Sequence, residues 1–290
     1  MSDSLETPNQ RFLIGLVRAA GGAILFAFPM MMTMEMWSLG YTIPSYKMGI
    51  FLILSIPLLA GLAYYSGFED PVGVVGALVD AFVAYAVGVV TVAIMLGLFA
   101  VLNPEEMSIT EVLGKVTLQA VAGGLGAVLA ASQLGGSHDH NHNHDSDSER
   151  EDQRGEQQDV PSYGRELFLM LAGALFLAFN VAPTEEVMLI AFMMTASHAI
   201  VLLLLSIAIM HAFVYVVKFK GQEAIPEEQS WWHVFLRFTV VGYAIALLVS
   251  LYCLWTFGRT DGTAFTEVMM MTVVLSFPTS LGAAAARLII

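Results

Sequence analysis

Carboxylates at the ends of long apolar runs are the residues of this sequence whose types and spacing could do chemistry. Glu35 and Glu186 each follow a threonine by two positions, Thr33 and Thr184. Three further glutamates end or begin apolar runs on what we expect to be the same side of the molecule: Glu111, Glu185 and Glu267. A ring of these carboxylates would attract cations and repel anions. The alternative is a rim of solvated glutamates with no binding role.

Other charged residues suggest contacts inside a helical bundle. Asp80 and Arg237 stand at nearly matching places in two apolar runs, so they could pair as a structural lock or as a gate. Lys115 follows Glu111 by four positions, which puts both side chains on one helix face where they can form an ion pair. A charge in a bilayer costs at least about 2.5 kcal/mol, so each of these groups needs a partner or a water-filled cavity.

The histidines fall into two groups. His198 and His211 share one apolar run, where they could relay protons or simply make polar contacts. The second group alternates with other polar residues in an acidic segment: His138, His140, His142 and His144. Imidazole and carboxylate ligands in such a strip would hold a divalent metal ion loosely. The alternative is a disordered polar linker, because the segment lacks the apolar residues that a core requires. We expect no other cofactor.

The elements that must position these residues are membrane-spanning helices. The 290 residues are 57% hydrophobic and only 13% charged, whereas soluble domains average about 25% charged residues. A bilayer core is crossed by roughly 20 apolar residues in a helix. Eight runs meet this length, near residues 12–37, 48–66, 73–101, 110–134, 163–183, 187–217, 232–257 and 264–288. We therefore predict an all-α polytopic membrane protein with eight transmembrane helices.

An internal repeat organises these helices. A shift of 151 positions places residues 21–36 on residues 172–187, with Thr33 on Thr184 and Glu35 on Glu186. A shift of 156 positions aligns the last helix of each half. This predicts two parallel tandem four-helix repeats, residues 1–135 and 161–290, joined by a disordered cytoplasmic loop at 136–160. The small residues of the fourth and eighth runs predict a close interface between the two repeats.

Basic residues near the ends of the runs predict the orientation. Nine of them fall on the side of the N-terminus and three on the other side, which favours cytoplasmic N- and C-termini. The three are Lys47, Lys115 and Arg259. The net charge of −13 comes largely from the loop and argues against nucleic acid as a partner. The expected partners are the lipid bilayer, inorganic cations and, as an open alternative, further copies of the chain.

The segment RAAGGAILFAFPMMMTMEMW, followed by SIPLL and GFEDP, resembles a family of bacterial integral membrane proteins of unknown function. The resemblance covers most of the chain and implies a multi-pass protein of the bacterial cytoplasmic membrane. It implies no reaction, substrate or site residue.

Two functions remain open from the sequence. No phosphate-binding loop and no HExxH motif is present, so we do not expect an enzyme. The first hypothesis is a permease for cations, divalent or coupled to protons, with Glu35 and Glu186 as the outer binding residues. The second is a non-transporting scaffold or sensor module that uses the His-rich loop.

Overall fold

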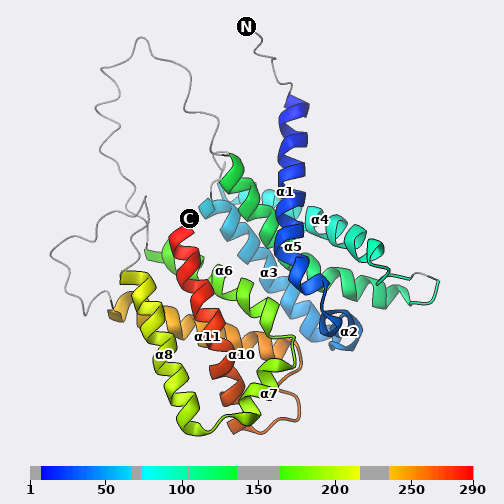
Figure 1. The fold of residues 1–290 in the computed structure, drawn as a ribbon. Helices are drawn as coiled ribbons and strands as arrows, with labels where there is room; N and C mark the ends of the chain where they lie inside the picture. Colours follow the sequence, from blue (N-terminus) through cyan, green and yellow to red (C-terminus); the bar gives the residue numbers. More distant parts are fainter. Residues whose placement is uncertain (1–7, 67–72, 104, 136–162, 216–234, 290) are drawn as a thin grey trace, which may run out of the picture.

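A computed structural model of the protein describes residues 8–66, 73–103, 105–135, 163–215 and 235–289 (Figure 1). All regular elements within these ranges are helical. The His-rich loop predicted at 136–160, with its four histidines, lies outside the described residues. The elements are α1 (Pro8–Met31), α2 (Met34–Thr42), α3 (Ser45–Ser66), α4 (Gly73–Leu98), α5 (Ile109–Gly135), α6 (Tyr163–Val181), α7 (Glu186–Met193), α8 (Ala196–Tyr215), the π-helix η1 (Phe235–Val240), α10 (Val241–Thr256) and α11 (Phe265–Ile289).

Eight helical segments in the described ranges are long and apolar enough to cross a membrane, as the sequence predicts. They are α1, α3, α4, α5, α6, α8, the continuous η1–α10 segment and α11. The short helices α2 and α7 follow α1 and α6 and lie at the same end of the molecule as the loop between α10 and α11. We call this the α2–α7 end.

Each side of the predicted loop has its own central helix, against which the other helices of that side pack. In the first half, residues 8–135, α5 packs against α1, α2, α3 and α4. In the second half, residues 163–289, α11 packs against α6, α7, α8 and α10. These two central helices are the most buried of the eight candidate spans.

Small residues let each central helix approach the first helix of its own half. A Cβ atom on Gly22 of α1 would collide with the carbonyl oxygen of Gly126 on α5. The same relationship joins Gly173 of α6 to Gly282 of α11. The sequence-based expectation that these small residues form the interface between the halves is therefore wrong. The close contact between backbones instead lies within each half, between the central helix and the first helix.

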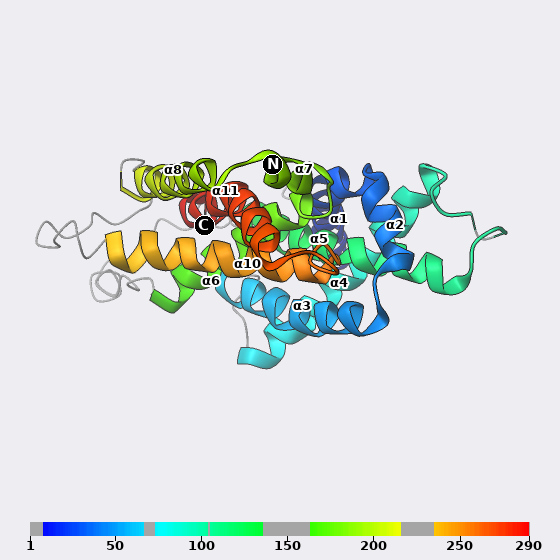
Figure 2. The same ribbon diagram turned by 90° about the horizontal axis from the view of Figure 1, so that it is seen from below.

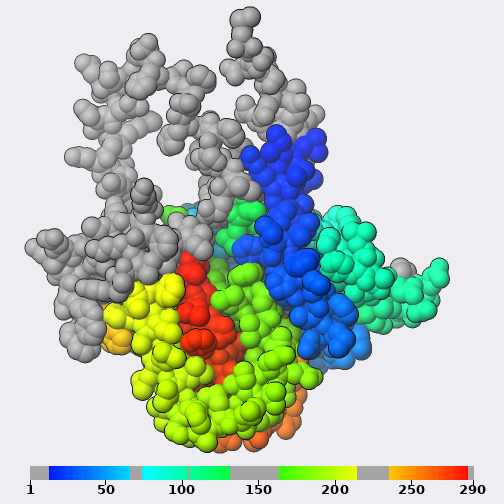
Figure 3. Space-filling view, viewed as in Figure 1, coloured from blue at the N-terminus to red at the C-terminus, as the bar shows by residue number. Residues whose placement is uncertain are grey.

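The two halves meet through larger side chains. α3 packs against α6 and α10, and α1 packs against α6. Aromatic rings fill this seam: the ring centroids of Phe26 and Phe176 are 4.4 Å apart, and those of Phe51 and Phe179 are 5.2 Å apart. Seen from below, α3 lies beside α10 and α6 (Figure 2). On the face in Figure 3, the blue surface of the first half borders the light-green surface of the second.

Candidate functional site

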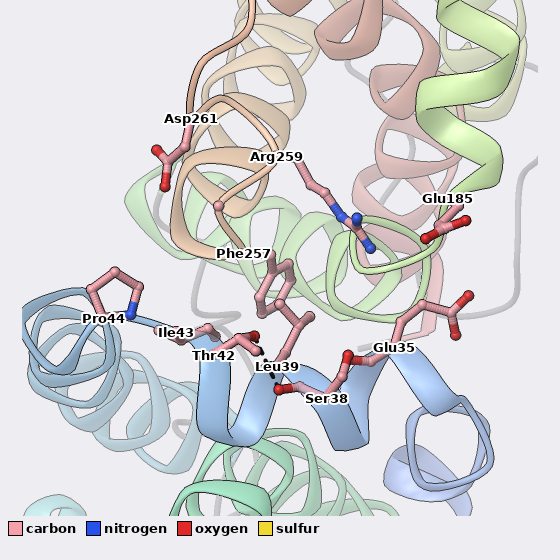
Figure 4. Close-up of a pocket in the computed structure, with 11 residues that line it drawn as sticks. Glu35, Ser38, Leu39, Thr42, Ile43, Pro44, Glu185, Phe257, Arg259 and Asp261 are labelled. Carbon is pink, nitrogen blue, oxygen red and sulfur yellow. Dashed lines mark hydrogen bonds between the residues drawn. The ribbon is translucent and has the colours of Figure 1, made fainter.

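A polar cleft of about 350 Å³ lies at the α2–α7 end, between the two halves (Figure 4). The first half contributes α2 and the turn that leads to α3, and the second half contributes the residue before α7 and the α10–α11 loop. The cleft is lined by Glu35, Ser38, Leu39, Thr42, Ile43, Pro44, Glu185, Phe257, Gly258, Arg259 and Asp261. Its charged side chains are three carboxylates and one guanidinium.

A buried lysine of the first half reaches the second half at this cleft. Lys47, in the first turn of α3, is only 1% exposed. Its Nζ donates to both carboxylate oxygens of Asp261 at 2.9 Å and to the carbonyl oxygen of Trp255 at 2.8 Å. The Trp255 carbonyl is in the last turn of α10, where a cation also interacts favourably with the helix dipole. These contacts compensate for the loss of hydration of the ammonium group.

Arg259 connects the α10–α11 loop to the turn between α6 and α7. Its guanidinium donates to the carbonyl oxygen of Pro183, and its Nη1 lies 3.8 Å from the sulfur of Met188. Figure 4 shows the guanidinium directed toward the side of the cleft that holds Glu35 and Glu185. Its Nε is buried without a hydrogen-bond partner among the described residues. Arg259 therefore fixes the turn and also places a positive charge in the cleft.

Glu186 lies beside the cleft rather than in it. Its side chain is exposed at the start of α7, and Glu185, one position earlier, lines the cleft instead. The pKa of Glu186 is lowered, first because its own backbone N–H donates to the carboxylate. The Thr184 hydroxyl and the charge of Arg259 lower this pKa further, while partial desolvation opposes them. Its carboxylate is therefore negatively charged at neutral pH.

The two threonines singled out from the sequence cap helices. Thr33 Oγ1 donates to the carbonyl oxygen of Met30 at 3.0 Å, at the end of α1. Thr184 Oγ1 donates to the carbonyl oxygen of Val181 at 2.8 Å, at the end of α6. Both hydroxyls thus satisfy carbonyl groups that a helix end leaves without an intrahelical partner.

The remaining glutamates of the expected ring have other surroundings. Glu111 forms a 2.8 Å ion pair with Lys115, as their spacing predicts, and Lys115 is buried against the ring of Tyr41. Gln119 continues the buried face of α5 and donates to the Lys115 carbonyl at 3.2 Å. Glu267 is half-buried in the first turn of α11. Of the five glutamates, only Glu35 and Glu185 line the cleft.

Asp80 and Arg237 lie on elements that do not pack together in the described part of the chain. α4, which carries Asp80, packs against α1, α3 and α5, whereas η1, which carries Arg237, packs against α8 and α10. The guanidinium of Arg237 is exposed and lies 4.3 Å from the ring centroid of Tyr163. The suggested lock between these residues therefore has no support from the packing.

The two histidines of α8 make local polar contacts. His198 is exposed in the first turn, where its Nδ1 lies 2.8 Å from Thr195 Oγ1. The Nδ1 of His211 lies 2.9 Å from Thr239 Oγ1, which joins α8 to η1. Among the residues that the structure describes, no group of three or more His, Cys, Asp or Glu side chains could hold a metal ion.

Sequence reasoning missed the ionic connection between the halves. Lys47, Lys115 and Arg259 entered the sequence argument mainly as the three basic residues on the side away from the N-terminus. In the structure Lys47 and Lys115 are buried, Arg259 is half-buried, and each has a specific partner. Their position against the prevailing charge bias was the available signal, because a basic residue kept on the unfavoured side calls for a structural reason.

The fold and composition define the class of this protein: it is a multi-pass, all-helical integral membrane protein. It belongs to the family described as "Putative integral membrane protein (DUF2391)", whose model matches residues 15–290. This confirms the family resemblance seen in the sequence. Comparison with curated proteins and with solved structures found no match.

Proposed function

We propose that this protein is a permease for cations, without enzymatic activity, and that the cleft at the α2–α7 end is where a cation first binds. The observation that carries the proposal is the position of Glu35 and Glu185, one from each half, in a single cleft. With Asp261 and Arg259, the lining side chains carry a formal charge of −2, which Lys47 behind Asp261 reduces to −1. A concave site with this sign of charge concentrates cations.

The proposal includes two parallel tandem repeats, residues 1–135 and 161–290. Two pairs of corresponding contacts support it. Thr33 and Thr184, aligned by the shift of 151, cap corresponding helices. Gly22 and Gly173 are aligned by the same shift, and their partners Gly126 and Gly282 are aligned by the shift of 156. A cleft between two such units would be opened by movement of one unit against the other, as in permeases built from repeats.

The proposed membrane is the bacterial cytoplasmic membrane, with both termini in the cytoplasm and the α2–α7 end outside. The burial of Lys47 and Lys115 strengthens this orientation, because neither lysine is then a free basic residue on the outer surface. The cleft would thus face the external medium. The His-rich loop at 136–160 would face the cytoplasm, where it would hold divalent ions loosely.

Cation flux into proteoliposomes tests the function. A panel should include H⁺, Na⁺, K⁺, Mg²⁺ and Zn²⁺, and the variant should be Glu35→Gln/Glu185→Gln. We expect the flux of the transported cation to fall by about tenfold or more, because the cleft loses the charge that concentrates it. Glu105→Gln/Glu106→Gln is the matched control, since both glutamates are exposed in the α4–α5 loop. Equal flux in the cleft variant and the wild type would remove these carboxylates from the mechanism.

The same preparation addresses the second hypothesis. Absence of flux for every cation in the panel would favour a scaffold or sensor module over a permease. Deletion of residues 137–158 then tests the loop separately. If the deletion leaves the binding of Zn²⁺ by the protein unchanged, the loop acts only as a tether between the halves.

A further inference from the structure

The ion pair of Lys47 with Asp261 is the polar part of an otherwise aromatic seam. Lys47 and Phe51 are one turn apart on α3, and both are buried against the second half. Phe51 contacts the rings of Phe179 and Phe257, with centroids 5.2 and 6.3 Å away. Lys47 ends this seam at the cleft, where Asp261 is 58% exposed. One face of Asp261 thus holds the ammonium and the other faces the cleft.

The second half supplies a complete binding site for this ammonium group. Two carboxylate oxygens and one carbonyl oxygen accept hydrogen bonds, and the ring centroid of Trp255 lies 5.2 Å from Nζ. Oxygen acceptors and an aromatic face together are the surroundings that favour an alkylammonium ion. The residue aligned with Lys47 in the second half is His198, which is exposed and contacts Thr195 of its own half. Of these two aligned residues, only Lys47 therefore connects the two halves.

We propose that Lys47 and the site formed by Asp261 and Trp255 are a latch that holds the two halves together at the cleft, and that opening of the cleft requires the ammonium to leave this site. The inference deepens the proposed function, because the latched cleft is the one assigned to cation binding. It can nevertheless be tested without measuring transport. Lys47→Met removes the hydrogen bonds that join the Asp261 carboxylate and the Trp255 carbonyl to the first half. Asp261→Asn instead leaves the buried ammonium without its charged partner, which is strongly unfavourable, so either change should release the halves.

The test is a distance measurement between the halves in the full-length protein. Spin labels on Ser45→Cys and Ala264→Cys report on this end, since both positions are exposed and neither lines the cleft. Cys253 is fully buried and serves as an unlabelled background residue. The variant is Lys47→Met, which keeps the length and apolar stem of the side chain. Lys115→Met is the matched control, because it removes another buried lysine whose partner, Glu111, lies in the same half.

We expect a single short distance in the wild type and in Lys47→Arg, and a second, longer population in Lys47→Met. Lys115→Met should keep the short distance. If Lys47→Met does not fold, Asp261→Asn provides the same test from the exposed side of the pair, where substitution leaves the buried seam intact. An unchanged distance distribution in folded Lys47→Met or Asp261→Asn would overturn the latch, whatever the flux measurements show.

Chemical rescue separates charge from packing. Lys47→Ala leaves the ammonium site empty, and n-propylammonium added to this variant should restore the short distance. n-Propanol has a similar shape without the charge and should not restore it. Equal restoration by the alcohol would overturn the ammonium site and would assign the contact to packing alone.

Discussion

Gly22 on α1 and Gly126 on α5 lie so close that a methyl group on either would collide with the carbonyl oxygen of the other. Gly173 on α6 and Gly282 on α11 stand in the same relationship. In a membrane, where lipid is as apolar as the side chains, such contact between backbones is a main source of helix association. Each half therefore has its central helix fixed to its first helix at one point.

Gly22→Ala should destabilise the protein by about 1–3 kcal/mol, because the added methyl group overpacks this contact. The expected result is a lower Tm of the purified protein in detergent. Gly173→Ala should have a similar effect, because its methyl group would collide with Gly282 in the same way. Gly21→Ala is the control: no atom lies within 4 Å of its added Cβ. It should be neutral or stabilising by up to about 1 kcal/mol, since alanine favours helix over glycine. Equal Tm values for the Gly21 and Gly22 variants would contradict the close contact.

Arg259→Met should destabilise the protein by about 1–3 kcal/mol, because the Pro183 carbonyl group loses its charged donor. We expect a lower Tm and faster hydrogen exchange in the turn between α6 and α7. Arg237→Met provides the comparison. Its exposed guanidinium stacks on Tyr163, so its removal should cost only about 0.5–1 kcal/mol. A larger loss for Arg237→Met than for Arg259→Met would refute the structural role assigned to Arg259.

Thr184→Val should make the stability of the protein less dependent on pH. The pKa of Glu186 is lowered in the folded protein, so its contribution to stability is present above the ordinary glutamate pKa. That contribution is lost as the pH falls through the lowered pKa. Without the Thr184 hydroxyl the folded-state pKa rises, and the maximum available contribution shrinks. Between pH 3 and pH 7, the Tm of the variant should therefore fall less on acidification than the Tm of the wild type.

Thr33→Val is the matched control for this effect. It removes the corresponding bond to the Met30 carbonyl at the end of α1. Its Tm should be lowered by the same amount at every pH in this range. If the two variants gave parallel profiles, Thr184 would act only as a helix cap, and Glu186 would have no part in the pH dependence.

The proposed orientation predicts the behaviour of reporter fusions. Alkaline phosphatase fused after Glu106 should be active, because the α4–α5 loop is proposed to lie outside. The same enzyme fused to the C-terminus should be inactive, and a fluorescent protein there should fluoresce. The reverse pattern would place the cleft on the cytoplasmic side and would assign Glu35 and Glu185 to release rather than to uptake.

The sequence alone determined the class of protein and the eight apolar spans. Both follow from local properties, because a bilayer crossing needs only a sufficient length of apolar residues in one helix. The Glu111–Lys115 ion pair was equally predictable, since a spacing of four fixes two side chains on one face. The alignment of Thr33 with Thr184 marked two corresponding helix ends, although their capping role was visible only in the structure.

Only the tertiary structure decided which charges meet. Lys47 and Asp261 are 214 positions apart, and Glu35 shares its cleft with Glu185 rather than with the aligned Glu186. The physical reason lies in the helices themselves: a span that is apolar on all sides carries little information about which face turns toward its neighbours. Packing between residues such as Gly22 and Gly126 fixes that rotation, and through it the partner of each buried charge.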